Sequence, residues 1–197
     1  EGSWMSREVH VQFCERAGVE LPCATHLVIL CRSQAEAQAA LGQVQAWVAR
    51  EGLTLHPEKT QIVDATQGGG FDFLGYHFER GMKWPRQKSL RKFKDTIRAK
   101  TRRTSGQSLR AIITDVNRSL RGWFAYFKHG HRTTFQPLDA WVRMRLRSIL
   151  RKRRGWKGRG RGRDHQRWPN AFFVQHGLNP LSNLYAWQLH LRQSRPG

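Results

Sequence analysis

The chain has 197 residues, 39% of them hydrophobic, which is enough for one domain or two small domains with a buried core. Its 35 Lys and Arg outnumber its 14 Asp and Glu, so the net charge is +21 at pH 7. A chain this basic repels itself unless it binds a polyanion, which makes nucleic acid the first candidate partner and an anionic membrane surface the second. No apolar run approaches the ~20 residues of a membrane span, and the N-terminus lacks the apolar stretch of a signal peptide. We therefore predict no membrane partner.

The cysteine content is small and odd: Cys14, Cys23 and Cys31. Such a set suits a reducing compartment, and its spacing matches no zinc-binding pattern. We predict a cytoplasmic protein with no metal site and no cofactor.

Short strands and one helix are predicted in the first part of the chain. The stretch VHVQF at residues 9–13 alternates weakly, which leaves a strand open there. The apolar run Leu27–Cys31 predicts a strand buried on both faces. Apolar residues then recur at helical spacing from Gln34 to Glu51, with Ser33 in position to cap that helix.

Two further strands are predicted at Thr60–Asp64 and Phe71–Phe78, with a glycine-rich loop at residues 68–70 between them. Gly75 lies inside the second of these strands, where it permits a bend or a close backbone approach. Residues 27–78 thus form a predicted strand–helix–strand–strand layer, which is too small to be a whole domain.

The second part of the chain is predicted to be helical and basic. Apolar spacing indicates helices over Ser89–Arg103, 107–128, Leu138–Arg151 and Pro180–Leu191. The outer face of the third of these helices is expected to hold Arg143, Arg147, Arg151 and Lys152.

The helix at 107–128 has the clearest amphipathic pattern. Ser105 or Ser108 is its expected N-cap. Its apolar stripe can anchor a core. Its opposite face is polar and can meet a polyanion: Arg110, Thr114, Asn117, Arg118, Arg121 and Lys128.

Residues 151–167, RKRRGWKGRGRGRDHQR, form an arginine–glycine tract of low complexity. We expect that this composition cannot pack against a core. The tract is therefore predicted to be a mobile loop or a segment ordered by RNA.

The positive charge is concentrated in residues 81–168, which contain 27 Lys and Arg but only four acidic residues. The basic residues there are interleaved with Trp, Phe and Tyr. Arginine matches the geometry of phosphate groups, and aromatic rings offer faces on which bases stack. This part of the chain is therefore expected to have a nucleic-acid partner.

Several motifs, in order, resemble those of bacterial group II intron reverse transcriptases. The last palm motifs of that family are similar to LVILCRS at 27–33, GLTLHPEKTQIVD at 52–64 and FDFLGYHF at 71–78. The family's thumb is similar to the basic helix that follows Trp84.

The maturase-specific region of the family is similar to SLRAIITDVNRSLRGWFAYFKHG at 108–130, WVRMRLRSILRKRRG at 141–155 and WPNAFFVQHGL at 168–178. The resemblance implies an α+β fold: a residual palm layer at residues 27–80, then a mostly helical thumb and maturase-specific domain (domain X) at residues 81–197. Residues 1–26 stay unassigned.

The chain departs from the family where the polymerase would hold its metal ions. The family has a Tyr-Ala-Asp-Asp turn before the strand that corresponds to LVILC, whereas this chain has Cys23, Ala24, Thr25 and His26. Thr and His cannot replace two anionic oxygen ligands of Mg²⁺. Lys59 corresponds to a lysine near the polymerase site, and without the aspartates we expect it to be a surface charge or a contact to the RNA backbone. We therefore expect no reverse transcriptase activity, no nuclease and no catalytic residues in this chain.

RNA is the partner that the resemblance implies, because in this family the intron RNA itself performs the transesterifications and the maturase stabilises its active fold. Candidate contacts to the RNA backbone are the basic residues of the thumb and maturase helices: Lys88, Arg91, Lys92, Lys94, Arg98, Lys100, Arg102, Arg103, Arg118, Arg121, Lys128, Arg143, Arg147, Arg151, Lys152, Arg153 and Arg154.

The leading hypothesis is a truncated group II intron maturase that binds intron RNA and assists splicing, in the cytoplasm of a bacterium and associated with the nucleoid or an RNA–protein particle. The intron's DNA target and self-association through an exposed palm edge are further partner hypotheses. Three alternatives stay open. The first is a decayed fragment with only non-specific nucleic-acid binding, the second a DNA-binding architectural protein, and the third a subunit that regains polymerase function by pairing with a separate fingers–palm chain.

Overall fold

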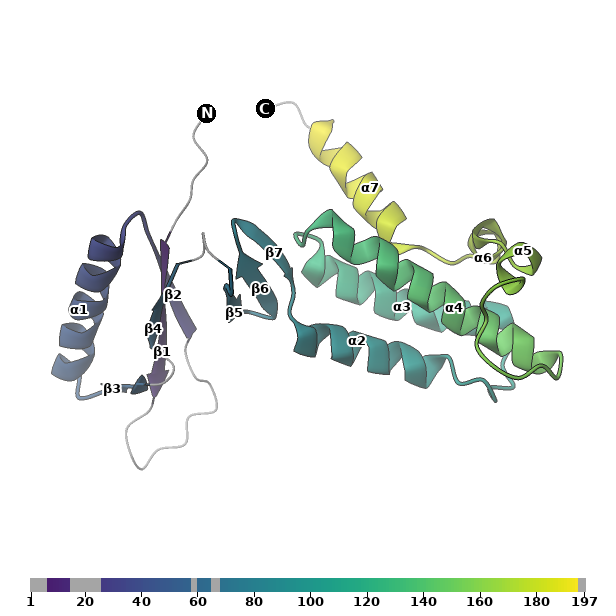
Figure 1. Ribbon diagram of the computed structural model, residues 1–197, viewed down its shortest axis with the longest axis horizontal. Coiled ribbons are helices and arrows are strands. Elements are labelled where there is room, and N and C mark those ends of the chain that lie inside the picture. Colours follow the sequence, from purple (N-terminus) through teal and green to yellow (C-terminus); the bar gives the residue numbers. More distant parts are fainter. Residues whose placement is uncertain (1–6, 15–25, 58–59, 65–67, 195–197) are drawn as a thin grey trace. The chain divides into compact units, whose positions relative to one another are not determined.

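The computed structural model describes residues 7–14, 26–57, 60–64 and 68–194, and the chain divides into two compact units (Figure 1). We call residues 1–83 the sheet unit and residues 84–197 the helical unit. The α+β class predicted from the sequence is confirmed. None of the helices in the described ranges is long and apolar enough to cross a membrane.

The sheet unit is built around β1 (Arg7–Cys14), which lies in the segment left unassigned from the sequence. β1 pairs antiparallel with β2 (His26–Cys31), β3 (Thr54–Leu55) and β4 (Gln61–Val63). The strand left open at residues 9–13 and the strands predicted at 27–31 and 60–64 are all confirmed.

Helix α1 (Gln34–Arg50) covers one face of this sheet. It begins as predicted, because the Ser33 hydroxyl accepts a hydrogen bond from the Glu36 N–H at 3.2 Å. A small core forms where Ala37 packs with Cys31 and Ile29. The expectation that β2 is buried on both faces is wrong: Leu30 is 61% exposed, because alternate residues of a strand point to opposite faces and only one face meets α1.

The predicted strand at 71–78 is also wrong, because the segment is a hairpin. β5 (Phe71–Phe73) and β6 (Tyr76–Glu79) are joined by Leu74 and Gly75, whose φ angles are 45° and 81°. Two successive positive φ angles are typical of the turn that connects two tightly paired strands. A second such turn, Arg80-Gly81, leads to β7 (Met82–Pro85). Gly75 thus makes a turn between strands rather than a bend within one.

The helical unit contains the larger core. Its helices are α2 (Gln87–Lys100), α3 (Leu109–Phe127), α4 (Phe135–Arg153), the short α5 (Asp164–Arg167) and α6 (Asn170–Gln175), and α7 (Leu181–Gln193), with a 3-10 turn, η2 (Arg132–Thr134), before α4. The four long helices lie within a few residues of their predicted bounds.

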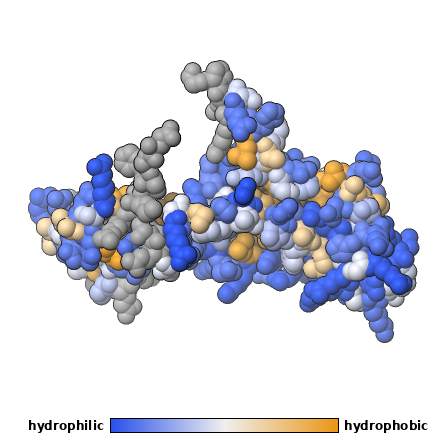
Figure 2. Space-filling model, turned by 45° about the horizontal axis from the view of Figure 1, so that its top comes forward, coloured by the Kyte–Doolittle hydropathy of each residue, from blue (hydrophilic) through white to orange (hydrophobic). Residues whose placement is uncertain are grey.

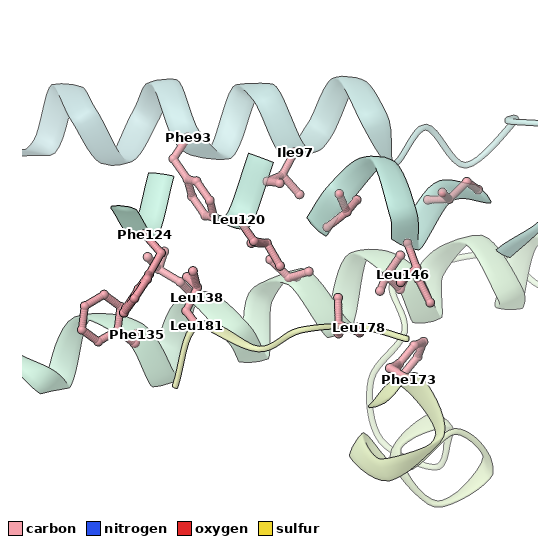
Figure 3. Packing of buried hydrophobic residues seen from close by; sticks show 14 of the residues in the cluster. Phe93, Ile97, Leu120, Phe124, Phe135, Leu138, Leu146, Phe173, Leu178 and Leu181 are labelled. Atoms are coloured by element: carbon pink, nitrogen blue, oxygen red, sulfur yellow. The ribbon is translucent and has the colours of Figure 1, made fainter. Parts of the chain in front are cut away.

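Figure 3 shows how α2, α3 and α4 share this core, with Phe93 and Ile97 from α2 facing Leu120 and Phe124 of α3. From the other side the core receives Leu138 and Leu146 of α4, Phe173 of α6, Leu178 and Leu181. The segment from residue 168 onward therefore covers one side of the three-helix layer.

The prediction that Asn117 lies on the exposed polar face of α3 is wrong. Its side chain is buried, with 7% of the residue exposed. Its side-chain amide donates to the Gly177 carbonyl at 2.7 Å, and its side-chain oxygen accepts from the Asn179 N–H at 3.0 Å. Asn117 therefore fastens the α6–α7 connection to α3.

The prediction that the arginine–glycine tract cannot pack is also wrong, since the tract packs against α4. α4 runs through Arg153, and the Gly160 N–H donates to the Ser148 hydroxyl at 3.1 Å. Asp164, 1% exposed, begins α5 and accepts from Arg151 at 2.9 Å. Composition alone missed these polar contacts, in which the tract buries a carboxylate and backbone groups beside the apolar contact that Trp156 makes with the main core.

Replacing Ser108 with alanine should lower the free energy of unfolding by about 1 kcal/mol, because Ser108 caps α3 by accepting from the Ala111 N–H at 3.1 Å. Urea unfolding followed by circular dichroism measures this loss. The matched control is Ser105→Ala, at the other cap position considered from the sequence. Its hydroxyl only accepts a 3.4 Å bond from the Gln107 N–H, so its effect should stay within about 0.5 kcal/mol. Equal losses would contradict the assignment of the cap.

Candidate nucleic-acid interface

Most of the basic residues selected from the sequence lie at the surface of the helical unit. Figure 2 shows hydrophilic residues over most of the visible face of this unit, with hydrophobic residues only in small separate spots. Ten of the seventeen candidates are exposed: Lys88, Arg91, Lys92, Arg98, Arg102, Arg118, Arg121, Lys152, Arg153 and Arg154. Six are half-buried: Lys94, Lys100, Arg103, Lys128, Arg143 and Arg151.

Arg147 is the candidate that the structure removes from the surface. Its side chain is 1% exposed, so its predicted place on the outer face of α4 is wrong. Its Nε donates to the Trp168 carbonyl at 2.9 Å and its Nη2 to the Asn170 side chain at 2.8 Å. Burial, together with the nearby charge of Arg143, lowers the pKa of the Arg147 guanidinium from its usual value. Arg147 is a structural residue that fixes the segment after α5.

Arg145, which was not selected from the sequence, holds α2 against α4. Its Nη2 donates to the carbonyl of Thr101, the residue that ends α2, at 2.8 Å, and its Nε donates to the Thr101 hydroxyl at 3.1 Å. These bonds satisfy acceptors at a helix C-terminus that would otherwise lack partners. Burial and the charges of Arg98, Arg103 and Arg159 lower the pKa of Arg145.

Helices α2 and α4 end on the same side of the helical unit (Figure 1), and several exposed basic residues follow or belong to their last turns. Arg153, in the last turn of α4, donates to the carbonyl of Gln107, just before α3. The end of α4 therefore lies next to the α2–α3 connection. We call this region the basic end; it is made of Lys100, Arg102, Arg103, Lys152, Arg153, Arg154 and the arginines of residues 159–167.

A shallow pocket of about 470 Å³ opens at the basic end. Its lining is polar throughout except for one alanine: Ala99, Lys100, Arg102, Thr104, Ser105, Gln107 and Asp115. Lys100 binds Asp115 at 2.6 Å, which leaves Arg102 as a pocket cation that makes no ion pair with a described residue. The pocket offers one guanidinium and several hydroxyl and amide groups to a ligand, which suits phosphate or ribose oxygens.

The acidic residues of the helical unit do little to neutralise this surface. The unit contains four of them. Asp139 and Asp164 are 2% and 1% exposed, so their carboxylates lie inside the unit and not on its surface. At the surface Asp95 pairs with Arg98 at 2.5 Å, and Asp115 with Lys100. Most of the exposed arginines thus have no acidic partner among the residues that the structure describes.

Residues 90–168 match the family model described as group II intron, maturase-specific domain. The chain contains a group II intron maturase-specific domain. This domain extends from Leu90 in α2 to Trp168 directly after α5, so it includes α3, α4 and the basic end. No curated protein matches the chain significantly.

The match confirms the resemblance for the maturase-specific domain. The likeness of residues 27–80 to a reverse-transcriptase palm stays a prediction, as do the three domain boundaries. Cys23, Ala24, Thr25 and Lys59 lie outside the described residues. Within the described ranges, no group of three or more His, Cys, Asp or Glu residues could hold a metal ion.

Proposed function

We propose that this chain binds group II intron RNA and assists its splicing without polymerase activity of its own. The maturase-specific domain implies a protein associated with group II introns. The observation that carries the RNA-binding step is the set of exposed arginines within that domain, most of them without an acidic partner in the described structure. Phosphate groups of a folded RNA supply the missing negative charge.

Assistance to splicing follows from differential binding. A protein that binds the active fold of an RNA more tightly than misfolded forms shifts the population toward the active fold. Because α2, α3 and α4 pack in one core, the backbone positions that carry their basic residues are fixed relative to one another. Fixed positions favour one arrangement of phosphates over others, which is the requirement for preferring a particular RNA fold.

Absence of polymerase activity is proposed from the sequence, because Thr25 and His26 occupy the positions where the family holds metal-binding aspartates. Primer extension with Mg²⁺ tests this part. Template-dependent incorporation above background by the chain alone would contradict it.

RNA specificity is tested by competition. Labelled group II intron RNA is bound to the full chain at 150 mM salt and challenged with excess tRNA and excess duplex DNA. The proposal expects intron RNA to resist both competitors. Free displacement by tRNA would instead favour a fragment with only non-specific affinity, and displacement by duplex DNA alone would favour a DNA-binding protein.

Removing two cations from the basic end should weaken RNA binding. In Arg102→Gln/Lys152→Gln, two exposed residues lose their charge, and each lost phosphate contact reduces the dependence of log K on log salt by about 0.7–0.9. We expect about a tenfold weaker Kd at 150 mM salt in filter binding. The control Arg50→Gln/Arg80→Gln removes two exposed cations from the sheet unit, outside the matched domain. Equal losses in the two variants would contradict a dedicated RNA surface at the basic end.

A further inference from the structure

We infer that residues 154–167 are a preformed binding site for the phosphodiester backbone of an RNA strand, in which two arginines are held in place by two tryptophans. This inference rests on the proposed RNA-binding function and assigns a site to residues that the sequence predicted to be a mobile loop or a segment ordered by RNA. We call this segment the arginine loop.

The arginine loop is tied to α4 at three points. The Lys157 carbonyl accepts from Arg151 Nε at 2.6 Å, and the Gly160 N–H donates to the Ser148 hydroxyl at 3.1 Å. The buried carboxylate of Asp164 accepts from Arg151 Nη1 at 2.9 Å. All three ties use α4, which belongs to the main core, so the loop has a defined path before any ligand arrives.

Between these ties the loop presents its charges outward. Arg159, Arg161 and Arg163 are exposed, and no described acidic residue pairs with them. They alternate with Gly158, Gly160 and Gly162. The alternation matters at Gly160, where an added Cβ would lie 2.3 Å from the Arg147 Cβ, so only glycine brings the backbone this close to α4.

Trp156 and Trp168 organise two further arginines of the loop. The Arg167 guanidinium carbon lies 4.3 Å from the centre of the Trp156 ring and 5.8 Å from that of Trp168. The Arg154 guanidinium carbon lies 5.6 Å and 5.5 Å from the same two rings. Each guanidinium therefore contacts both indoles, which restricts its motion.

These ring contacts leave the N–H donors of the two guanidinium groups available. An aromatic ring is not one of the oxygen acceptors that a guanidinium binds most strongly, and each guanidinium carries five N–H donors. The Arg154 guanidinium makes no hydrogen bond or ion pair with any described residue, and the Arg167 guanidinium has only a 3.6 Å approach to Asp164. Both side chains can therefore bind a phosphate bidentately without first breaking a strong internal bond.

These features fit a charged backbone better than a small ligand. Eight exposed basic residues lie between residues 152 and 167, while the only acidic residue of that stretch, Asp164, is buried. The pocket at the basic end is not lined by the residues of the arginine loop, so recognition by the loop would follow successive phosphates along a strand. A preformed loop loses little conformational entropy on binding, in contrast to a disordered arginine-rich segment.

The test compares three full-chain proteins on two probes, a transcribed group II intron RNA and tRNA, from 50 to 250 mM salt. Arg161→Gln/Arg163→Gln removes two outward charges. We expect the slope of log K against log salt to become shallower by about 1.5, and Kd at 150 mM salt to rise about tenfold or more. The Arg50→Gln/Arg80→Gln protein is the charge-matched control and should keep the wild-type slope. Equal slopes in the two variants would overturn the inference.

A second variant, Gly160→Ala, tests whether the loop must be preformed. It keeps the net charge but forces the loop away from Arg147, so we expect faster tryptic cleavage after Arg159 and Arg161 and about tenfold weaker RNA binding. Gly42→Ala in α1 is the control, since a Cβ there meets nothing within 4 Å. Wild-type affinity in Gly160→Ala despite faster cleavage would overturn preorganisation. If Gly160→Ala unfolds the protein, the double arginine variant decides the inference.

The two probes separate this inference from the proposed function. One outcome is that Arg161→Gln/Arg163→Gln has a shallower salt slope than the wild-type chain on both RNAs, while tRNA competes freely with intron RNA. This outcome would support the loop as a phosphate site and overturn intron specificity. Intron preference with slopes unchanged in Arg161→Gln/Arg163→Gln would uphold the proposed function and overturn the loop. Binding of neither RNA by the wild-type chain would overturn both.

Discussion

Replacing Arg147 with alanine should lower the free energy of unfolding of the helical unit by about 3–5 kcal/mol, the largest stability loss expected of any single substitution considered for this chain. Arg147 is 1% exposed and donates to the Trp168 carbonyl at 2.9 Å and to Asn170 at 2.8 Å. Its guanidinium carbon also lies 5.2 Å from the centre of the Phe173 ring. Alanine would leave a cavity in this place and a buried carbonyl without a donor.

Urea unfolding followed by circular dichroism at 222 nm measures this loss, because the helical unit contains most of the helices. Arg121→Ala is the matched control, since Arg121 is an exposed arginine in the middle of a neighbouring helix. Its effect should stay within about 0.5 kcal/mol. If both variants unfold at the same urea concentration, Arg147 has no structural role and belongs again with the surface arginines.

Replacing Asp139 with alanine should cost about 3 kcal/mol and loosen α7. Asp139 is 2% exposed, and its two carboxylate oxygens accept from the Leu181 N–H at 2.7 Å and the Ser182 N–H at 2.9 Å. These are first-turn N–H groups of α7, whose own cap residue, Pro180, provides no side-chain bond. An aspartate of α4 thus caps a helix far along the chain. Its negative charge also interacts favourably with the positive, N-terminal end of the α7 helix dipole.

Hydrogen exchange locates this effect, since the amides of Leu181 and Ser182 should exchange faster in Asp139→Ala than in the wild-type chain. Asp95→Ala is the control, because the Asp95 side chain is 67% exposed and its pair with Arg98 lies at the surface. Such a pair contributes up to about 1 kcal/mol. A loss in Asp139→Ala no larger than that of the control would contradict the capping role.

Hydrophobic periodicity was enough to predict the long helices, because the stripe on α3 that includes Ile112, Val116 and Leu120 is buried at the spacing read from the sequence. Of the two N-caps that the sequence left open, Ser105 and Ser108, the structure has Ser108. Periodicity failed for Phe71–Phe78, where apolar residues continue through the turn at Leu74-Gly75, so no polar residue marks the end of the strand.

Long-range polar contacts are what the sequence could not reveal. Asn117, Asp139 and Arg147 lie among charged or polar neighbours on their helices, and nothing local distinguishes them from exposed residues. Their partners follow at separations of 60, 42 and 21 residues. A residue of this kind is found only when the fold shows that a backbone group opposite it needs a partner.

The arginines of α4 show how closely the two roles are interleaved. Arg145 and Arg147 donate to backbone carbonyls of other segments, Arg151 ties the arginine loop, and Arg153 and Arg154 extend into the basic end. The helix therefore uses its first arginines to build the fold and its last ones to present charge. From the sequence, Arg147 and Arg151 are placed on the same surface as Arg153 and Arg154, and Arg145 is not selected.

The most direct test of the central claim is the splicing rate of a group II intron precursor RNA at limiting Mg²⁺, with and without the full chain. Scarce Mg²⁺ leaves the phosphates of the folded intron poorly neutralised, so a protein that binds the active fold should raise the fraction of RNA that splices. We predict faster splicing with the wild-type chain and with Arg50→Gln/Arg80→Gln, and little acceleration with Arg161→Gln/Arg163→Gln. An unchanged splicing rate at saturating wild-type protein, with the RNA bound, would contradict a maturase function.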